Sequence, residues 1–377
     1  MSEEDGAMAY SKGDPVPWFS ADTHTTPQFQ FNAAAGRYVV LSFLGSTSRG
    51  SSQQIVRDVE QHRNEFSDER VCFFGVIIDP ADFDKAKVRE FVPGVRYFKD
   101  FQHFVSQGYD AISKGLAGTQ ANLQYRPFTL VLDQRLRTIA SIPIEDSGVG
   151  HIAKVLDIVR PLPGFGEHSD ADVQAPVLIV PNIFEPEFCK ELVGLYEAQG
   201  GEDSGFMRDQ NGKTVGVYDY GTKRRRDYVI EDEALRKKCM FKIHDRLAPE
   251  IRRAYQFNAT RMERYIVACY EGEHGGHFRA HRDNTTKATA HRRFAVSLNL
   301  NDDYDGGCVW FPEFGKKLFK PPAGGAVVFS CSLLHEATPV TSGKRYVYLP
   351  FLYDDAAAKV REANQQFLGG NVNAPPA

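Results

Sequence analysis

Three side chains in the second half of the sequence are of the types that hold a transition metal. His281 and Asp283 form an H-x-D pair in GGHFRAHRDN, and His335 follows later in SLLHEATPV. Two imidazoles and one carboxylate on one face of a metal leave the opposite face open, which suits a non-haem Fe(II) that must bind a co-substrate and then O₂. An H-x-D pair alone is also typical of a solvated loop, so the third residue makes the pattern informative.

The elements that must position these residues are short strands. Residues i and i+2 of a strand point the same way, so one strand can present both His281 and Asp283, while His335 must come from a distant strand. From residue 261 onwards, short apolar runs separated by Gly, Asn and Asp predict an antiparallel sandwich or barrel. These runs are Arg264–Tyr270, Phe294–Leu300, Cys308–Phe311, Ala326–Ser330 and Tyr346–Leu352.

Helical patterns flank these strands. Two helices are expected before them, at Glu187–Gln199 and Glu233–Ala254, and one after them, at Asp354–Phe367. The final GGNVNAPPA has the composition of a frayed tail.

The first half of the sequence follows a different pattern. Two apolar strand candidates, Tyr38–Leu44 and Val71–Ile78, enclose a helical pattern over Gln53–Phe66, which predicts a parallel βαβ unit. A hairpin and a closing helix are expected at Phe128–Leu132, Thr138–Ser141 and His151–Val159. Proline, glycine and small polar residues over 160–176 then predict a linker, with the domain boundary near residue 168.

The second half resembles the prolyl 4-hydroxylase-like branch of the iron(II)- and 2-oxoglutarate-dependent oxygenases over residues 177–354. The segments that carry the resemblance are YEGEHGGHFRAHRDN, LNLNDDYDGGCVWFPEFG and AVVFSCSLLHEATPVTSGKRYVYLPF, in this order. It implies a double-stranded β-helix (jelly-roll) domain with flanking helices over 175–355, followed by a C-terminal helix and tail over 356–377. It also implies Fe(II) at His281, Asp283 and His335, 2-oxoglutarate and O₂ as co-substrates, ascorbate as a candidate reductant, and hydroxylation of an organic substrate with release of succinate and CO₂.

The same resemblance assigns residues around the metal. Arg345 is expected to pair with the distal carboxylate of 2-oxoglutarate, because a guanidinium offers two parallel donors, while Lys344 points the other way. Tyr270 matches a tyrosine whose hydroxyl bonds the co-substrate, although it precedes the H-x-D pair by more residues than is usual, and a core aromatic is the alternative. Halogenation is disfavoured because Asp283 fills the site that a halide needs. No catalytic nucleophile is expected.

Three residues are candidates to line the substrate pocket: Asn284, Ser297 and Arg225. Arg225 belongs to the basic run Lys223–Arg226 in YGTKRRRDYVI. Two interpretations of this run stay open: a solvated turn, or a rim that recognises an acidic or polar substrate.

The first half resembles a peroxiredoxin of the thioredoxin-like class through GDPVPWF, GRYVVLSFLGSTS and RPFTLVLDQRLRTIAS. This implies an α/β thioredoxin-like domain over 12–165. The family motif P-x-x-x-T-x-x-C keeps its threonine at Thr47, but Phe43 replaces the proline and Gly50 replaces the peroxidatic cysteine. Arg126 matches the arginine that would support the thiolate, and Cys72 lies in an apolar strand pattern where a thiol is inert. The domain is therefore expected to be catalytically inactive, with partner binding, self-association or anion binding at the helix start after Thr47 as its remaining roles.

Composition excludes several classes of protein. Hydrophobic residues make up 42% and charged residues 25%, so disorder of the whole chain is excluded. The net charge of −4 does not favour a nucleic-acid binder or an anionic-membrane binder. No apolar run is long enough for a membrane helix, the acidic start does not predict a signal peptide, and scattered cysteines without a CxxC predict reduced thiols in the cytoplasm.

The substrate is not readable from the sequence. A prolyl or other peptide residue, a free amino acid and a natural-product scaffold all fit, and the oligomeric state stays open. Two other classes of function compete with the oxygenase: a binding protein built from two decayed enzymes, and a zinc hydrolase of cupin-like shape. The presence of His281, Asp283, His335 and Arg345 argues against decay, and a zinc hydrolase would leave Arg345 without a task.

Overall fold

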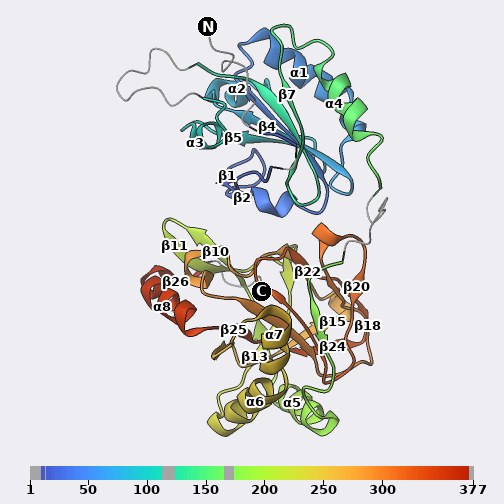
Figure 1. Ribbon diagram of the computed structural model, residues 1–377, viewed down its shortest axis with the longest axis vertical. Helices are drawn as coiled ribbons and strands as arrows, with labels where there is room; N and C mark the ends of the chain where they lie inside the picture. The colour runs from blue at the N-terminus through green and yellow to red at the C-terminus, as the bar shows by residue number, and fades with distance from the viewer. Residues whose placement is uncertain (1–9, 13, 113–123, 165–173, 373–377) are drawn as a thin grey trace. The chain divides into compact units, whose positions relative to one another are not determined.

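The computed structural model describes residues 10–12, 14–112, 124–164 and 174–372 (Figure 1). The chain divides into two units: residues 1–173 with 312–315, and residues 174–311 with 316–377. Part of the predicted linker, residues 165–173, lies outside the described residues. None of the described helices is both long and apolar enough to cross a membrane.

A mixed sheet of five strands forms the centre of the first unit's described part. Its strands are β3 (Tyr38–Gly45), β4 (Val71–Ile77), β5 (Val95–Lys99), β6 (Phe128–Leu132) and β7 (Thr138–Pro143). In the order β5-β4-β3-β6-β7, the first three are parallel, and β6 and β7 are antiparallel to their neighbours. Every residue of β3 is buried, as a central strand covered on both faces requires. Two short strands, β1 (Ser20–Ala21) and β2 (Phe29–Gln30), pair separately.

Two helices cover one face of this sheet, α1 (Gly50–Gln61) and α4 (His151–Val159) (Figure 1). The sequence predicted α4 at its observed bounds, but α1 begins three residues before the predicted Gln53 and ends before Phe66. Ser51 and Ser52 are buried in this first turn, where the Ser52 hydroxyl donates to the Leu44 carbonyl at 2.6 Å. Two shorter helices complete the unit, α2 (Pro80–Asp84) and α3 (Phe104–Gly108).

A buried polar chain links α4 to the sheet. The Nε2 atom of His151 lies 2.7 Å from the Thr129 hydroxyl, which lies 2.8 Å from the Ser42 hydroxyl. Burial, with a smaller effect of Lys154, lowers the pKa of His151 to about 4. The imidazole is therefore neutral in the folded protein at neutral pH.

We expect His151 to make the first unit less stable in acid. Between its ordinary pKa of about 6.5 and the folded value of about 4, the unfolded chain binds a proton that the folded unit does not. The free energy of unfolding therefore falls as pH decreases through this window. His151→Gln removes this contribution, so calorimetric unfolding should show the stability advantage of wild type over the variant shrinking from about pH 7 to about pH 4.5. Wild type and variant contain the same carboxylates, so the pH dependence of their stability difference comes from His151. A stability difference that does not change with pH would contradict the lowered pKa of His151.

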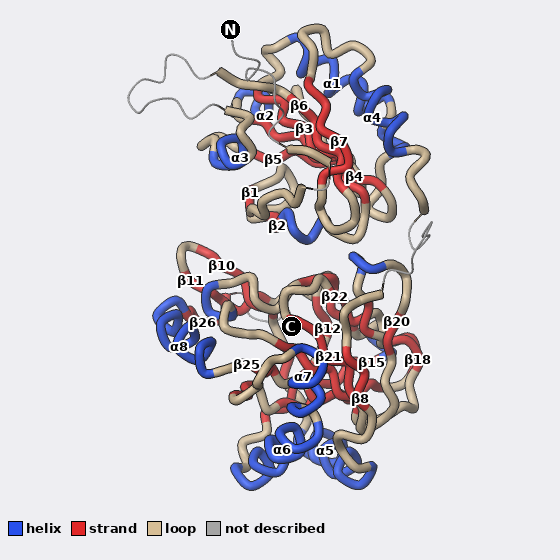
Figure 2. The backbone as a smooth tube through the Cα atoms, in the orientation of Figure 1, coloured by secondary structure: helices blue, strands red, loops and turns tan. Residues whose placement is uncertain are grey.

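Two sheets dominate the second unit (Figure 2). The strands of the smaller sheet, in spatial order, are β12 (Lys223–Arg224), β16 (His277–His281), β22 (His335–Ala337), β19 (Val309–Trp310) and β20 (Leu318–Phe319). The path through the larger sheet is β14 (Arg261–Glu263), β25 (Phe351–Tyr353), β17 (Phe294–Asn299), β24 (Lys344–Tyr348), β15 (Ile266–Glu271), β13 (Arg226–Val229) and β9 (Glu202–Asp203), with β21 (Ala326–Ser330) beside β17 and β8 (Leu178–Val180) beside β21.

The two faces of the larger sheet contact different parts of the unit. Side chains alternate along each strand, and one set, which includes Val267, Leu298 and Tyr348, packs against helices α5 (Pro186–Gln199), α6 (Glu233–Arg246) and α7 (Ala248–Tyr255). The opposite set, which includes Tyr270, Ser297 and Arg345, lines a pocket together with side chains of the smaller sheet. The alternation therefore separates the helix-covered core from the candidate site.

Two predicted elements are interrupted by proline. The expected helix Glu233–Ala254 is two helices, α6 and α7, because Pro249 lacks the N–H that would continue the first one. The expected strand Tyr346–Leu352 is likewise divided into β24 and β25 at Pro350.

The C-terminus differs from the prediction. After α8 (Asp355–Asn364), residues 368–372 form β26, which pairs in parallel with β11 (Lys213–Val217) next to β10 (Phe206–Gln210). The prediction of a frayed tail is therefore wrong for residues 369–372, and residues 373–377 lie outside the described part. A further small pair is β18 (Asp305–Gly306) with β23 (Val340–Ser342).

Candidate active site

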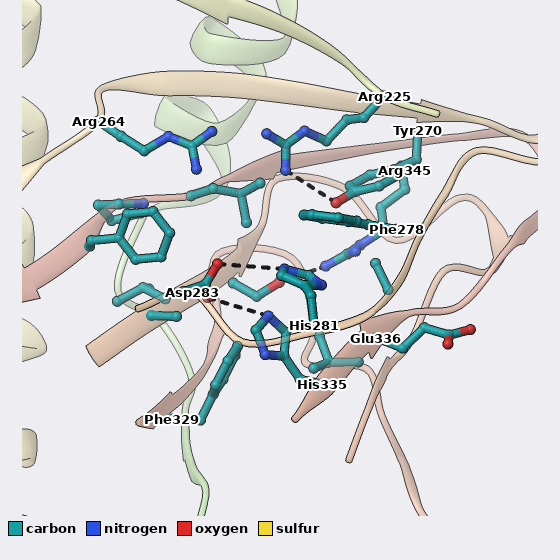
Figure 3. Close-up of a pocket in the computed structure, with 18 residues that line it drawn as sticks. Arg225, Arg264, Tyr270, Phe278, His281, Asp283, Phe329, His335, Glu336 and Arg345 are labelled. Atoms are coloured by element: carbon teal, nitrogen blue, oxygen red, sulfur yellow. Dashed lines mark hydrogen bonds and ion pairs between the residues drawn. The ribbon is translucent and has the colours of Figure 1, made fainter. Parts of the chain in front are cut away.

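The three predicted metal ligands converge at one end of the pocket (Figure 3). His281 ends β16 and lies directly opposite His335 at the start of β22. The ligand atoms of His281, Asp283 and His335 all lie within 4.8 Å of one another. Oδ1 of Asp283 lies 3.5 Å from Nε2 of His281, and Oδ2 of Asp283 lies 3.3 Å from Nε2 of His335.

One detail differs from the expectation that a single strand presents both residues of the H-x-D pair. β16 ends at His281, and Asp283 lies just beyond it, where its N–H donates to the Cys331 carbonyl at 3.0 Å. A register irregularity between Phe278 and His281 accompanies this end of the strand. Such an irregularity re-aims the side chains that follow it.

The hydrogen bonds of the imidazoles leave their Nε2 atoms available. Nδ1 of His281 lies 2.8 Å from the Arg279 carbonyl, and Nδ1 of His335 lies 3.0 Å from the Leu333 carbonyl. A carbonyl oxygen only accepts, so each Nδ1 carries a proton and each Nε2 is the nitrogen that faces Asp283. The ring of Phe278 also stacks on His281 with a centroid distance of 3.5 Å.

The charges of the three residues suit a cation. Burial alone would raise the pKa of Asp283, but the neighbouring His335 and His281 lower it well below its ordinary value. Burial, together with His281, lowers the pKa of His335 to about 4. The carboxylate is therefore ionised and His335 is neutral at neutral pH, which are the states that bind a metal.

Arg345 is a buried cation whose partners are neutral. Only 1% of its surface is exposed, and its guanidinium donates to the Ser297 hydroxyl at 2.7 Å and to the Asn299 side-chain carbonyl at 3.0 and 3.2 Å. Across the described residues, no carboxylate pairs with it. Gly307 allows this position, because a Cβ there would lie 2.9 Å from Cδ of Arg345.

Tyr270 lies beside Arg345, whereas Lys344 points the other way. Tyr270 is directly opposite Arg345 on the neighbouring strand, is buried, and lines the pocket. Its hydroxyl accepts from the Arg225 guanidinium at 3.4 Å. Lys344 is exposed and lies 3.4 Å from the Glu197 carboxylate, on the other side of the strand.

The three substrate-pocket candidates have different positions. Ser297 lines the pocket and supports Arg345, and Arg225 lines it as well. Asn284 is not among the lining residues, and its amide donates to the Ser332 hydroxyl at 2.8 Å.

The basic run is not a uniformly solvated turn. Lys223 and Arg225 are buried, whereas Arg226 is exposed. Arg225 donates twice to Asp227, at 2.6 and 2.7 Å, and that carboxylate has a pKa far below its ordinary value because Arg225 and Lys223 outweigh the effect of burial. Within this run, Arg225 therefore faces the pocket, whereas Arg226 faces solvent.

Sequence reasoning missed several residues of the pocket. Asn299 follows Ser297 by two positions on β17, so strand alternation could have identified it as a second support for Arg345. Phe278, Phe329 and Phe351 form apolar walls, and no local pattern distinguishes them from core residues. Arg264 also lines the pocket, from the turn between β14 and β15, where the sequence predicted a strand.

Comparison with known proteins identifies the domain around this site. Residues 265–353 match the family model described as 2OG-Fe(II) oxygenase superfamily. The matched segment contains all three candidate metal ligands and Arg345. It confirms the resemblance of the second half to 2-oxoglutarate oxygenases.

Curated relatives match parts of the chain. A procollagen lysyl hydroxylase and glycosyltransferase of Acanthamoeba polyphaga mimivirus is 28% identical over 184 residues, which are 45% of this chain and 18% of the relative. A PKHD-type hydroxylase of Synechococcus sp. (strain JA-2-3B'a(2-13)) is 32% identical over 22% of this chain and 38% of the relative. The PKHD-type hydroxylase PiuC of Pseudomonas aeruginosa is 34% identical over 27% and 47%. The chain thus spans less than half the length of each.

Proposed function

We propose that this chain, whose residues 265–353 form a 2OG-Fe(II) oxygenase domain, is an iron(II)- and 2-oxoglutarate-dependent dioxygenase that hydroxylates an organic substrate. The observation that carries the proposal is the combination, in one pocket, of a metal-type donor set with a buried arginine that has only neutral partners. The donor set fits a divalent cation, and Arg345 fits the carboxylate of a co-substrate. The two-sheet arrangement of the unit supports a double-stranded β-helix with flanking helices.

His281, Asp283 and His335 would hold Fe(II). Two imidazoles and one carboxylate would leave coordination positions for a chelating 2-oxo acid and for O₂. When bound, the iron with 2-oxoglutarate and O₂ supplies the oxidising power for hydroxylation, and succinate and CO₂ are the co-products. The backbone carbonyls that accept from each Nδ1–H fix the orientation of the two rings.

Arg345 would bind and orient 2-oxoglutarate. A buried guanidinium makes strong bonds to a carboxylate, and Ser297 and Asn299 hold it in place without neutralising it. Tyr270, opposite Arg345, has a hydroxyl in the same pocket that would donate to the co-substrate. Phe278, Phe329 and Phe351 would exclude water from the region where the reaction takes place.

The names of the relatives favour hydroxylation as the outcome. Each is called a hydroxylase, and one is a procollagen lysyl hydroxylase. A peptidyl substrate, such as a prolyl residue, is therefore our first proposal, and a free amino acid or natural-product molecule is the second.

The cytoplasm is the location that we propose for the protein. Its six cysteines are all free thiols, which suits this reducing compartment.

Release of succinate from 2-oxoglutarate separates this function from its competitors. The protein is incubated with Fe(II), 2-oxoglutarate and ascorbate as reductant, without a target substrate. We expect slow formation of succinate, because the proposed metal site could convert 2-oxoglutarate even when no target is bound. The same protein loaded with Zn(II), or treated with a chelator, should form none. Absence of succinate with Fe(II), together with failure to bind 2-oxoglutarate, would favour the non-catalytic binding protein, and hydrolysis supported by Zn(II) would favour the zinc enzyme.

We also propose that the first unit is a thioredoxin-like, peroxiredoxin-like domain without peroxidase activity. Its mixed sheet with α1 and α4 on one face supports this class. Gly50, at the start of α1, offers no nucleophile. Anion binding after Thr47 is less favourable than the sequence suggested, because the buried Asp82 carboxylate, which accepts from the Thr47 N–H at 2.7 Å, already places a negative charge beside Thr47. Binding of a protein partner or self-association is its remaining role.

The protein should not consume hydrogen peroxide enzymatically. Burial raises the pKa of the Cys72 thiol to about 12, so almost no thiolate is present near neutral pH. Full-length protein with a dithiol reductant is expected to remove peroxide no faster than the Cys72→Ser variant does. Rapid turnover that disappears in Cys72→Ser would show instead that this thiol becomes exposed and reactive.

A further inference from the structure

Arg264 lines the pocket together with Arg225 and Arg345, and its guanidinium has few partners. Its guanidinium makes one long hydrogen bond, 3.4 Å to Oδ2 of Asp227, and lies 5.3 Å above the ring of Phe351. Within the described part of the chain, these are its only side-chain partners. Figure 3 shows its guanidinium pointing into the pocket towards that of Arg225. Most of the hydrogen-bonding capacity of Arg264 is thus unused.

The nearest carboxylate is already committed to another arginine. Asp227 receives two short bonds from Arg225, at 2.6 and 2.7 Å, and a third, also at 2.6 Å, from the Ser204 hydroxyl. Behind this pair, Lys223 Nζ donates to the Ser204 hydroxyl and to the Gly205 carbonyl, and burial together with Arg225 lowers the pKa of Lys223 well below its ordinary value. One carboxylate is therefore shared by two guanidinium groups, those of Arg225 and Arg264.

The other carboxylates near the pocket do not compensate this excess. Asp283 belongs to the metal site, and Glu263 pairs with His291 and Arg292 at 3.0 and 2.7 Å. Glu336 lines the pocket, but its carboxylate lies on the opposite side from Arg264 in Figure 3, and its nearest cation is Arg279 at 4.0 Å. Burial, with Arg225 beside it, lowers the pKa of Arg264 to about 10, so the guanidinium stays charged at neutral pH.

The backbone at Arg264 also indicates a positioned side chain. Its φ angle is +66°, in the left-handed region that a bulky residue rarely adopts. This conformation lies in the tight connection between β14 and β15 and directs the side chain into the pocket. Strain of this kind persists where the surrounding structure imposes it, and it is concentrated at binding sites.

We propose that Arg264 is a specificity-determining residue that binds a carboxylate group of the substrate. The inference rests on the proposed function, because it assumes that the metal and Arg345 take the co-substrate and that the rest of the pocket takes the target. With Arg345 engaged by 2-oxoglutarate, Arg264 is the pocket arginine whose anionic partner among the described residues, Asp227 at 3.4 Å, is shared with Arg225. The apolar side chains of Phe278, Phe329 and Phe351 would hold the carbon skeleton between this charge and the metal.

Matched acids and amides test the proposal without knowledge of the natural substrate. Full-length protein is loaded with Mn(II) and saturating 2-oxoglutarate, which blocks Arg345, and binding is measured by calorimetry. One probe pair is cyclopentanecarboxylate and its carboxamide, and the other is N-acetylglutamate N-methylamide and the glutamine analogue. Each pair has nearly the same shape and differs in charge. At least one acid should bind at least about tenfold more tightly than its amide, as expected for a charge-assisted bond.

The two pairs distinguish the source of the carboxylate. Discrimination of the ring acid alone indicates a small acid or a chain terminus, and discrimination of the capped glutamate indicates an acidic residue in a peptide. Equal affinity for acid and amide in both pairs, or no binding of any probe, would overturn the proposal. Failure of the protein to bind 2-oxoglutarate in the first step would overturn the proposed function instead, and this inference with it.

Variants locate the effect at Arg264. Arg264→Leu should remove the preference for the acid, and Arg264→Lys should retain part of it because the charge remains. Arg226→Leu is the matched control, since it removes an exposed arginine of the same unit that does not line this pocket. Thermal unfolding and 2-oxoglutarate binding check that Arg264→Leu is folded. Retention of the full acid preference in folded Arg264→Leu would contradict the assignment.

Discussion

Replacing His281 with alanine is expected to lower the rate of succinate formation from 2-oxoglutarate by more than about a hundredfold. Loss of a partner that merely orients a metal ligand already costs about 10- to 100-fold in affinity or activity, and this change removes the ligand itself. The fold should survive, because the core of the second unit lies between the larger sheet and helices α5 to α7, away from this residue. Succinate is measured with Fe(II) at saturating 2-oxoglutarate.

A matched histidine controls for the substitution. His244 on α6 is exposed and does not line the pocket, so His244→Ala should leave succinate formation unchanged. Circular dichroism should show that both variants are folded. Near-normal turnover by His281→Ala would remove His281 from the metal site and contradict the ligand assignment.

Replacing Arg345 with alanine should weaken 2-oxoglutarate binding by about 30- to 150-fold. This range corresponds to about 2–3 kcal/mol, the scale of a charge-assisted hydrogen bond. The expectation comes from a buried guanidinium that has neutral partners on one side and the pocket on the other. The dissociation constant can be measured by calorimetry with Mn(II) in place of Fe(II), which separates binding from catalysis.

Lys344 is the control for this prediction. It is the neighbouring cation on the same strand, and its exposed pairs with Glu197 and Glu271 contribute little. Lys344→Ala should therefore change 2-oxoglutarate binding by less than about twofold. A damaging Lys344→Ala with a silent Arg345→Ala would mean that the strand presents its other face to the pocket.

The sequence was most informative where chemistry restricts the choice of residue. The H-x-D pair, the later histidine and Arg345 form a set that few other functions require, and the structure brings these residues to one pocket. Tyr270 was a candidate through the family resemblance alone, and its position opposite Arg345 on the neighbouring strand comes from the structure. Central strands such as β3 and β4 were also predictable, since parallel strands covered on both faces are continuous apolar runs.

The rest depended on tertiary contacts that leave no local pattern. Arg264 was predicted inside a strand, but its backbone is left-handed and its side chain lies in the pocket. The polar segment that contains residues 369–372 was expected to be frayed, yet it forms hydrogen bonds with β11, whose partner strand could not be inferred from composition. The basic run Lys223–Arg226 was left open between a solvated turn and a substrate rim, and only the positions of Asp227 and Ser204 explain why Lys223 and Arg225 are buried.

The most direct test of the central claim is a crystal structure of the full-length protein with Mn(II) and 2-oxoglutarate, grown without oxygen. We expect the metal to lie about 2.0–2.3 Å from Nε2 of His281, a carboxylate oxygen of Asp283 and Nε2 of His335, as for first-row metals with nitrogen and oxygen ligands. The 2-oxo acid should chelate the same metal and place its distal carboxylate on Arg345. A metal bound elsewhere, or a 2-oxoglutarate molecule that does not contact Arg345, would contradict the account.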